Sequence, residues 1–398
     1  YSIDIDGLVR KAVREIYGSR GEELINAHLF EITNTALQQA VDTSLSGIAE
    51  SDPDFVQQFK ENTAVFAAFK NHQQTKEIAA LLYDENGKLK PFYKFRREAL
   101  QISKDYNVTW LQTEYNTAVR AARMAANMKK YKKTSHLYPN LEYIETSSAH
   151  PRASHLSYVG TILPIEHPWW NDHLPPSDWN CACSVRPTDK PATPVPDGEY
   201  TPPVFRNNPE RTAEFLNIKE TAYCKHTAES LEGEIKEVAG DLLRTSQCEV
   251  LETYEGKNGG YLKVVKQNKA ERDKNLITYK IMADNGGRYS LLEELPGDKV
   301  KNPDAFNFKT LRNSEAKHPI TPNGQKAIQR SIEQAAKQAD EIVIRLNQEY
   351  PSYSLYRGLY AALQNTHTQN VKVIFILRPG RKPLELDADK LRSRFFGK

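Results

Sequence analysis

The sequence predicts a multidomain protein: a mainly α-helical N-terminal block with an irregular, loop-rich module, followed by an α/β C-terminal domain. Three observations carry this prediction. The chain has 398 residues, enough for two or three domains at roughly 100–200 residues each. Apolar residues recur at helical spacing through residues 1–133. From residue 269 onward, helical and strand-like segments alternate instead.

The clearest helix of the N-terminal block is expected from about Val108 to Tyr131. Its apolar stripe consists of Leu111, Tyr115, Ala118, Val119, Ala122 and Ala126. Four lysines, at positions 129, 130, 132 and 133, lie near its end. Cations there oppose the negative pole of the helix dipole, which favours a structural interpretation of this cluster over a nucleic-acid contact.

Residues 134–189 show no sustained period, which predicts a loop-rich module that completes a first region over residues 1–189. Residues 190–209 are rich in proline, so we expect an extended linker without helix. Residues 210–268 then predict a connector made of a helix and a hairpin. The turn of that hairpin is placed at Asn258-Gly259-Gly260.

Residues 269–398 are predicted to form the α/β domain. The expected order is αβββαβ, and near-continuous apolar late strands indicate a sheet covered by helices. The expected elements are a helix at 270–284, strands at 289–292, 305–308 and 310–317, a helix after Thr321-Pro322 and a strand at 341–346, followed by a helix at 353–364 and a strand at 371–377.

Composition excludes several classes of protein. No apolar run approaches the roughly 20 residues of a membrane-spanning helix. The formal net charge of +3 is too small to name a partner for the whole chain. Four cysteines are too few for a disulfide scaffold, which favours a reducing compartment. The N-terminal stretch has no signal-peptide core, and no GxGxxG, Walker A or GxSxG string is present.

One group of residues suits metal-dependent phosphodiester chemistry. Asp304 precedes Glu315 and Lys317, and alternation along a strand places Glu315 and Lys317 on one face. A hairpin could bring both carboxylates together as ligands of Mg²⁺ or Mn²⁺, with the lysine beside the attacking water. Between Lys299 and Arg330, seven basic residues stand against two acidic ones, which suits a phosphate backbone.

This segment resembles the PD-(D/E)xK nuclease superfamily, and in particular the toxin-type tRNA nuclease domains of contact-dependent inhibition proteins. The resemblance implies a catalytic set of Asp304, Glu315 and Lys317. It also implies an upstream acid, with Glu271, Glu293 and Glu294 as candidates, and a helix glutamine, Gln334 or Gln338. We include Glu293 and Gln338 in the predicted site. The substrate would be RNA or DNA.

Two other interpretations of these residues remain open. The first is a solvated ion pair on an edge strand, without catalysis. The second is a metal-independent ribonuclease of the barnase, EndoU or RelE type, in which His318 or His367 would act as an acid–base group.

The loop-rich module holds a second group of chemically active residues. Cys181 and Cys183, together with His155 and His173, could bind Zn²⁺, because thiolate and imidazole are its preferred ligands. The alternative is two reduced cysteines that pack beside Trp170 and Trp179 without a metal.

The same stretch resembles the phage Mu gpF-like head morphogenesis family, the minor head proteins. The matching positions are His155, Gly160, Trp170, Pro175, Pro176, Trp179, Asn180, Cys181 and Cys183. The chain departs from the pattern at Ala149 and His150, where an aspartate is common. The resemblance implies partners among the portal and capsid proteins, and a place in the virion and the bacterial host cytoplasm. A purely structural assembly protein, with an inactive nucleic-acid-binding C-terminal domain, is the rival interpretation.

Overall fold

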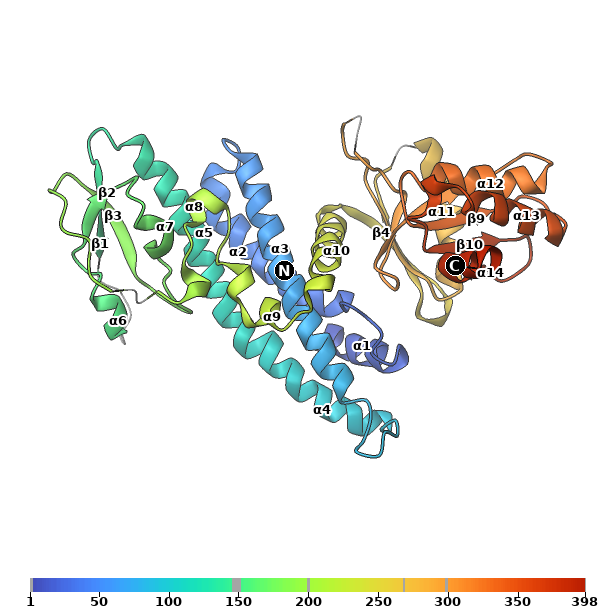
Figure 1. Ribbon diagram of the computed structural model, residues 1–398, viewed down its shortest axis with the longest axis horizontal. Coiled ribbons are helices and arrows are strands. Elements are labelled where there is room, and N and C mark those ends of the chain that lie inside the picture. Colours follow the sequence, from blue (N-terminus) through green and yellow to red (C-terminus); the bar gives the residue numbers. More distant parts are fainter. Residues whose placement is uncertain (1–2, 145–151, 199–200, 268, 298–299, 398) are drawn as a thin grey trace. The chain divides into compact units, whose positions relative to one another are not determined.

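The computed structural model describes residues 3–144, 152–198, 201–267, 269–297 and 300–397 (Figure 1). The chain divides into two compact units, Tyr1–Leu243 and Arg244–Lys398. Helix α10 (Glu229–Gln247) contains the boundary between them. None of the helices in the described ranges combines the length and the apolar composition that a membrane span requires.

The first unit begins with a helical block, as predicted. Its main helices are α1 (Ile5–Gly18), α2 (Ala27–Leu45), α3 (Pro53–Ala80), α4 (Phe92–Lys104) and α5 (Leu111–Lys133). Side chains of Asp4, Asn26 and Asp52 accept hydrogen bonds from the free N–H groups at the starts of α1, α2 and α3. Apolar residues of α1–α5, such as Val13 and Leu29, form a common core. A π-helical turn (Asp105–Trp110) joins α4 to α5.

A buried ion pair links α3 to α5. Lys70 and Glu114 are in contact, and both are almost fully buried. The Lys70 Nζ also donates to the Tyr106 carbonyl at 2.7 Å, and the Tyr223 hydroxyl donates to Glu114 at 2.9 Å. Removing one partner of such a pair leaves a buried charge uncompensated, at a cost of about 3–5 kcal/mol. Sequence reasoning missed this pair, because neither residue interrupts its helical pattern.

The module predicted to be loop-rich contains a small antiparallel sheet. Its strands are β1 (Asn140–Ile144), β2 (Ile162–Pro164) and β3 (Ser184–Thr188), in the order β2-β1-β3. Two one-turn helices, α6 (Ala153–Leu156) and α7 (Trp170–His173), lie between the strands. The fully buried Trp170 packs in a core that includes Met124 and Met128 of α5. The long helix is therefore the support of the module.

The proline-rich segment 190–209 does not separate the two units. Thr193 N–H donates to the Ile162 carbonyl at 2.8 Å, and Phe205, which is 2% exposed, packs edge-on against Trp179. Burial of Phe205 keeps this segment within the first unit, although residues 189–192 are exposed. Short helices complete the unit: η3 (Pro203–Phe205), α8 (Pro209–Thr212), η4 (Ile218–Glu220) and α9 (Ala222–Lys225).

The second unit is built on an eight-stranded mixed sheet in the order β11-β10-β9-β8-β7-β6-β5-β4. Its strands are β4 (Val250–Glu255), β5 (Tyr261–Val265), β6 (Arg288–Leu291), β7 (Ala305–Asn307), β8 (Arg312–Lys317), β9 (Glu341–Arg345), β10 (Val373–Leu377) and β11 (Leu384–Asp387). Its helices are α11 (Lys269–Asp284), α12 (Gly324–Ala335), α13 (Ser352–Leu363) and α14 (Ala388–Phe396). The run from α11 to β9 has the predicted order αβββαβ.

Helices cover both faces of this sheet (Figure 1). Val343 of β9 shares a core with Tyr279 and Met282 of α11, whereas its neighbour Ile342 shares a core with α12, α13 and α14. The hairpin β4–β5, predicted as part of a connector, instead belongs to the sheet, because β5 pairs with β6 and buries Leu262. The unit therefore begins near residue 244 rather than at the predicted residue 269.

Candidate functional site

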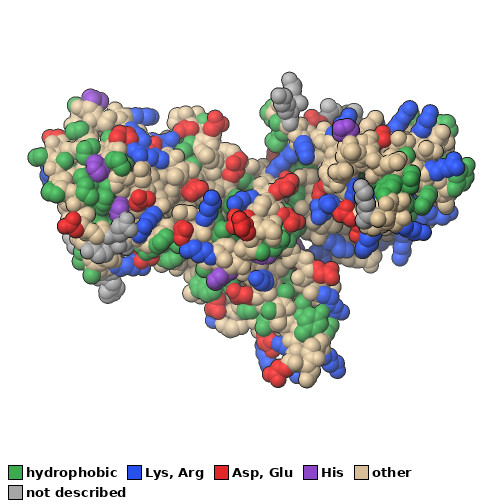
Figure 2. Space-filling model, in the orientation of Figure 1, with side chains coloured by type: hydrophobic (Ala, Val, Ile, Leu, Met, Phe, Trp, Pro, Cys, Tyr) green, Lys and Arg blue, Asp and Glu red, His purple; other side chains and the backbone are tan. Residues whose placement is uncertain are grey.

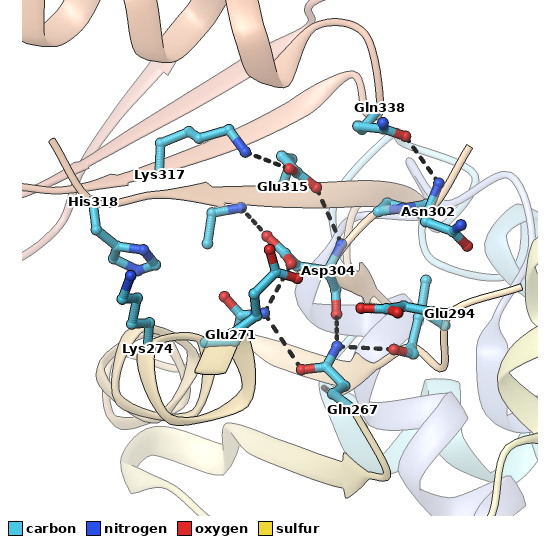
Figure 3. A pocket seen from close by; sticks show the side chains of 14 residues that line it. Gln267, Glu271, Lys274, Glu294, Asn302, Asp304, Glu315, Lys317, His318 and Gln338 are labelled. Carbon is cyan, nitrogen blue, oxygen red and sulfur yellow. Dashed lines mark hydrogen bonds and ion pairs between the residues drawn. The ribbon is translucent and has the colours of Figure 1, made fainter. Parts of the chain in front are cut away.

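A cavity of about 340 Å³ lies in the second unit, where α11 approaches the end of β8 (Figure 3). It collects side chains from α11, the chain before β7, β8 and the residues after α12. Its polar lining residues are Gln267, Glu271, Lys274, Asn275, Glu294, Asn302, Asp304, Glu315, Lys317, His318 and Gln338. Three predicted residues, Asp304, Glu315 and Lys317, are therefore brought together in one cavity.

Asp304 lies just before β7, where the pairing of β7 with β8 ends. Strand β7 pairs with β8 only as far as Ala305 opposite Ser314. Beyond that point, the Ala316 N–H donates to the Asp304 Oδ2 at 2.8 Å. The other carboxylate oxygen, Oδ1, accepts from Asn275 Nδ2 of α11 at 2.8 Å. Each carboxylate oxygen has two lone pairs, so these contacts orient Asp304 and leave it able to bind a cation.

Glu315 and Lys317 lie on the same side of β8, as alternation predicts, while Ala316 is buried in the core between them. The Lys317 Nζ lies 2.5 Å from the Glu315 Oε1. The Glu315 Oε2 accepts from the Asp304 N–H at 3.3 Å. Glu315 is only 6% exposed, so its carboxylate is held by local donors away from bulk water.

The cavity raises the pKa of both of its buried carboxylic acids. Burial, with the Asp304 charge next in importance, raises the pKa of Glu315 to about 7. Burial also raises the pKa of Asp304 above its ordinary value, against the hydrogen bonds from Ala316 and Asn275. Two neighbouring acids that disfavour each other's ionised form are a common feature of cation-binding sites. A divalent cation offsets both the repulsion between the two carboxylates and the cost of burying their charges.

The upstream acid differs from the residue that we predicted. Glu294 and Glu271 line the cavity, whereas Glu293 does not. The Glu293 carboxylate instead accepts from the Glu249 N–H at 3.3 Å, and its carbonyl accepts from Arg244 at 2.8 Å. Adjacent residues of an extended segment point to opposite sides, so Glu294 takes the place predicted for Glu293.

The predicted helix glutamine has one counterpart in the cavity. Gln338, which follows α12, accepts from the Asn302 N–H at 2.9 Å through its Oε1 and lines the cavity. Gln334 is exposed and does not line it. Gln338 thereby fixes the segment that leads into Asp304.

The two histidines proposed for a metal-independent ribonuclease, His318 and His367, differ in their position relative to the cavity. His318 lines the cavity, and its Nε2 lies 2.8 Å from Thr278 Oγ1. Burial, with Arg345 and Lys274 nearby, lowers the pKa of His318 to about 4. A neutral His318 at pH 7 is a poor proton donor. His367 is exposed and does not line this cavity.

Sequence reasoning missed two residues that support the cavity from α11 and the segment before it. Asn275 holds the Asp304 carboxylate, and Gln267 Nε2 donates to the carbonyls of Leu292 and Asp304 at 2.8 and 2.9 Å. The sequence feature that could have indicated Asn275 is its polar side chain at a position on the buried face of α11, where it is only 3% exposed.

A second candidate site lies in the first unit, where α6 approaches the loop before β3. Cys181 Sγ and Cys183 Sγ each lie 3.6 Å from His155 Nδ1, and all three ligand atoms fall within 4.8 Å of one another. Zn–S and Zn–N bonds of about 2.3 and 2.1 Å at a tetrahedral angle give an S···N separation of about 3.6 Å. The three side chains therefore have the spacing of a zinc site.

Arg152 positions this group from the residue before α6. Its Nε lies 3.1 Å from Asp178 Oδ2, and its guanidinium donates to the Trp179 carbonyl at 2.9 Å. A hydrogen bond with Cys183 is the main reason that the pKa of Cys181 is lowered to about 4. Thiolate is the form of cysteine that binds metals.

The fourth predicted zinc ligand, His173, is not brought into the group. Its ring stacks on Trp169 at a centroid distance of 4.3 Å, and its Nδ1 lies 2.8 Å from the Trp169 carbonyl. The described residues thus supply three ligand atoms here. His150 and Ala149, the positions where the sequence departs from the family pattern, lie outside the described residues.

A helical unit with a small Cys/His module precedes a mixed α/β unit with a carboxylate–lysine cavity. Residues 62–186, from the middle of α3 to β3, match the family "Phage Mu protein F like protein". The first unit therefore carries a Phage Mu F-like region, which lies within the region 1–189 predicted from the sequence.

Two curated relatives are similar to part of the chain. Protein F of Escherichia phage Mu, whose description names capsid assembly, is 32% identical over 76 residues. The Mu-like prophage FluMu F protein of Haemophilus influenzae is 36% identical over 77 residues. Each match covers 19% of this chain, and 17% and 18% of the respective relative. No solved structure gives a significant match to the chain.

Proposed function

We propose that the chain is a phage or prophage minor head protein that carries a C-terminal metal-dependent nuclease. The Phage Mu F-like region supports the first part, and the capsid-assembly description of protein F of Escherichia phage Mu supports partners in the phage head. Those partners are the portal and capsid proteins, and the chain resides in the virion or the bacterial host cytoplasm.

One observation carries the nuclease proposal: Asp304, Glu315 and Lys317 meet in one polar cavity. Asp304 and Glu315 would hold Mg²⁺ or Mn²⁺, since carboxylate oxygens are the ligands that these cations prefer. When bound, such a cation supplies Lewis-acid stabilisation of the scissile phosphate and lowers the pKa of a bound water. The exposed Glu271 at the cavity mouth is available as a further acid.

The protein's own groups define the remaining steps. The Lys317 Nζ donates to Glu315 Oε1 at 2.5 Å. From this position it would orient the attacking water and oppose the charge that develops on the phosphate. Asn275 holds the Asp304 carboxylate, and Gln338 holds the segment that leads into Asp304 through the Asn302 N–H. The carboxylate is therefore oriented before a ligand binds. The αβββαβ order is the same as that of the PD-(D/E)xK nucleases, which agrees with this assignment.

The first test replaces Lys317 by alanine in the full chain. Cleavage of tRNA and of single- and double-stranded DNA is followed with Mg²⁺, with Mn²⁺ and with EDTA. We expect Lys317→Ala to lower the cleavage rate about 100-fold or more, because it removes transition-state stabilisation. Lys390→Ala, which removes an exposed lysine of α14, serves as the matched control and is expected to keep the full rate.

The outcomes separate the three interpretations. Activity that persists in EDTA would favour the metal-independent ribonuclease. Absence of cleavage on all three substrates, with the fold intact by circular dichroism, would favour the structural assembly protein with an inactive C-terminal domain.

We further propose that His155, Cys181 and Cys183 hold Zn²⁺ as a structural cross-link within the head-morphogenesis region. The 3.6 Å Sγ–Nδ1 spacings support this assignment, and so does the burial of all three side chains. Elemental analysis of the purified chain is expected to give one zinc per molecule. Two freely titratable thiols without zinc would instead support plain packing of the cysteines.

A further inference from the structure

A second cavity of the C-terminal unit is lined by basic residues that the proposed catalytic group does not use. It has a volume of about 530 Å³ and lies where β9 and β10 end and α11 finishes. Its walls include Ile281, Asn285, Leu346, Leu377, Pro379 and Gly380. Its four charged lining residues are Arg345, Arg378, Arg381 and Lys382, and no carboxylate lines it.

A tight turn after β10 presents three of these cations. Arg381 N–H donates to the Arg378 carbonyl at 3.2 Å, which closes the turn Arg378-Pro379-Gly380-Arg381. Gly380 has φ of +67°, a conformation that disfavours other residues, and proline fixes the preceding φ. The turn therefore holds Arg378, Arg381 and Lys382 at a defined place on the rim of the cavity.

The positive charge of the cavity is only partly compensated. Arg381 has an exposed ion pair with Glu349 at 3.3 Å. The buried Nε of Arg378 has no hydrogen-bond partner within the described part of the chain. A buried guanidinium nitrogen without an acceptor is costly, and an anionic ligand with several oxygens would satisfy it.

A polar chain joins this cavity to the catalytic one. Arg345 Nε donates to Thr278 Oγ1 at 2.9 Å, and the same hydroxyl lies 2.8 Å from His318 Nε2, which lines the first cavity. Both cavities also border α11. Asn275 of α11 lines the first cavity and Asn285, directly after the helix, lines the second; ten residues at the helical rise span about 15 Å.

The charge of the whole unit favours the same class of ligand. Residues 244–398 contain 27 Lys and Arg against 18 Asp and Glu, an excess of nine positive charges. Figure 2 shows Lys and Arg side chains repeatedly on the visible face of this unit. Residues 1–243 contain 27 basic and 33 acidic residues, an excess of six negative charges. The net positive charge of the chain therefore lies in the unit that contains the proposed nuclease.

We propose that the Arg378–Lys382 cavity binds a backbone phosphate of the nucleic-acid substrate, about four nucleotide steps from the scissile bond. This inference rests on the proposed nuclease function and adds its substrate-binding site. A strand that crosses α11 would place one phosphate beside Asp304 and Glu315 and a later one beside Arg378. A free nucleotide would need no such second site.

The test measures binding separately from cleavage. Fluorescence anisotropy of labelled 12-nucleotide RNA and DNA strands, and of a DNA duplex, is recorded with the full chain in EDTA. We expect Arg378→Ala/Arg381→Ala/Lys382→Ala to weaken binding at least tenfold. The slope of log affinity against log salt should become shallower by about 0.7 for a single strand, because one phosphate contact is lost.

The matched control removes the same charge elsewhere in the unit. Arg357→Ala/Lys390→Ala/Arg394→Ala changes exposed residues of α13 and α14, on the opposite face of the sheet from α11, and should change affinity less than threefold. Arg381→Ala/Lys382→Ala leaves the half-buried Arg378 in place. This variant should bind more weakly than the control triple even if the Arg378 variant fails to fold.

The outcomes are distinct from those of the nuclease test. Equal affinities for the cavity triple and the control triple would overturn this inference, even if metal-dependent cleavage is observed. Inorganic phosphate that competes at low millimolar concentration, without oligonucleotide binding, would identify a site for a free anion and would also overturn it. Binding by the parent chain that the cavity variants lose, without cleavage by any variant, would support it while removing the proposed nuclease.

Discussion

At the scale of single residues, Glu315 is a side chain of the candidate site whose ionisation is disfavoured by its surroundings. It is buried, paired with Lys317 and close to Asp304, and its pKa is raised to about 7. A raised pKa means that the folded chain binds a proton more tightly than the unfolded chain does. The stability that this proton contributes is present below the ordinary pKa of 4.5 and is lost as the pH rises toward 7.

The first prediction compares Glu315→Gln with the parent chain between pH 4.5 and 8. Without added metal, the free energy of unfolding of the variant should rise relative to the parent as pH increases, by up to about 3 kcal/mol, and level off above pH 7. Chemical denaturation at each pH measures the difference. The comparison uses the difference in unfolding free energy between variant and parent because His318, with its pKa lowered to about 4, gives the stability of both proteins the opposite pH dependence. Glu385→Gln, an exposed change, should give a flat difference.

The second prediction concerns the Cys/His group. In the presence of zinc, Cys181→Ser should lower the melting temperature of the first unit, and a chelator should lower that of the parent chain while leaving the variant unchanged. A ligand at 1,000 times its Kd stabilises by about 4 kcal/mol. Cys224→Ser is the control, since this buried cysteine of α9 lies outside the group. A chelator effect of equal size in Cys181→Ser and the parent would contradict the zinc assignment.

At the scale of elements, β7 and β8 show which parts of the site were predictable. Alternation placed Glu315 and Lys317 on one face of a strand, and the structure has them there. The choice between Glu293 and Glu294 depends on the phase of an irregular segment, which no period fixes. The support of Asp304 by Asn275 depends on how α11 packs against the sheet, a long-range contact that sequence spacing does not encode.

The same limit explains the two displaced boundaries. Helical periods and the αβββαβ order were visible in the sequence, because each is a local pattern. The hairpin β4–β5 was also visible, but its membership of the sheet depends on the pairing of β5 with β6 across the whole of α11. Proline content predicted a linker at 190–209, but the burial of Phe205 holds this segment against the first unit.

The third prediction follows from the position of β5 in the sheet. A fragment of residues 244–398 should unfold cooperatively, whereas one of residues 269–398 should not fold stably. The shorter fragment lacks the fully buried Leu262, Val264 and Val265, and it leaves β6 as an exposed edge. Thermal denaturation followed by circular dichroism distinguishes them. Equal melting curves would show that the hairpin is dispensable.

At the scale of the whole molecule, charge divides the chain more sharply than its net value suggests. The formal net charge of +3 hides an excess of six negative charges in residues 1–243 and nine positive charges in residues 244–398. Charge at this scale governs association with polyanions and its salt dependence rather than the fold.

The fourth prediction uses this division. On a heparin column at pH 7.5, the fragment 244–398 should elute at higher salt than the full chain, because the acidic first unit is absent. The elution salt concentration is the measurement, and a cation-exchange resin without sugar provides the comparison. Elution of both proteins at the same salt would show that the first unit does not weaken polyanion binding.

The strand order of the second unit has a consequence for how it forms. The eight strands follow one another across the sheet in the order of the chain, so every strand pairs with the strand made just before it. No strand has to insert between two strands that are already paired, and each of the three parallel pairings, β5–β6, β8–β9 and β9–β10, closes a crossover that contains a helix. Sequential pairing keeps the contact order lower than a rearranged strand order would, although the parallel crossovers still slow folding. The unit is therefore suited to assembling strand by strand during synthesis, with its basic turn and α14 added last.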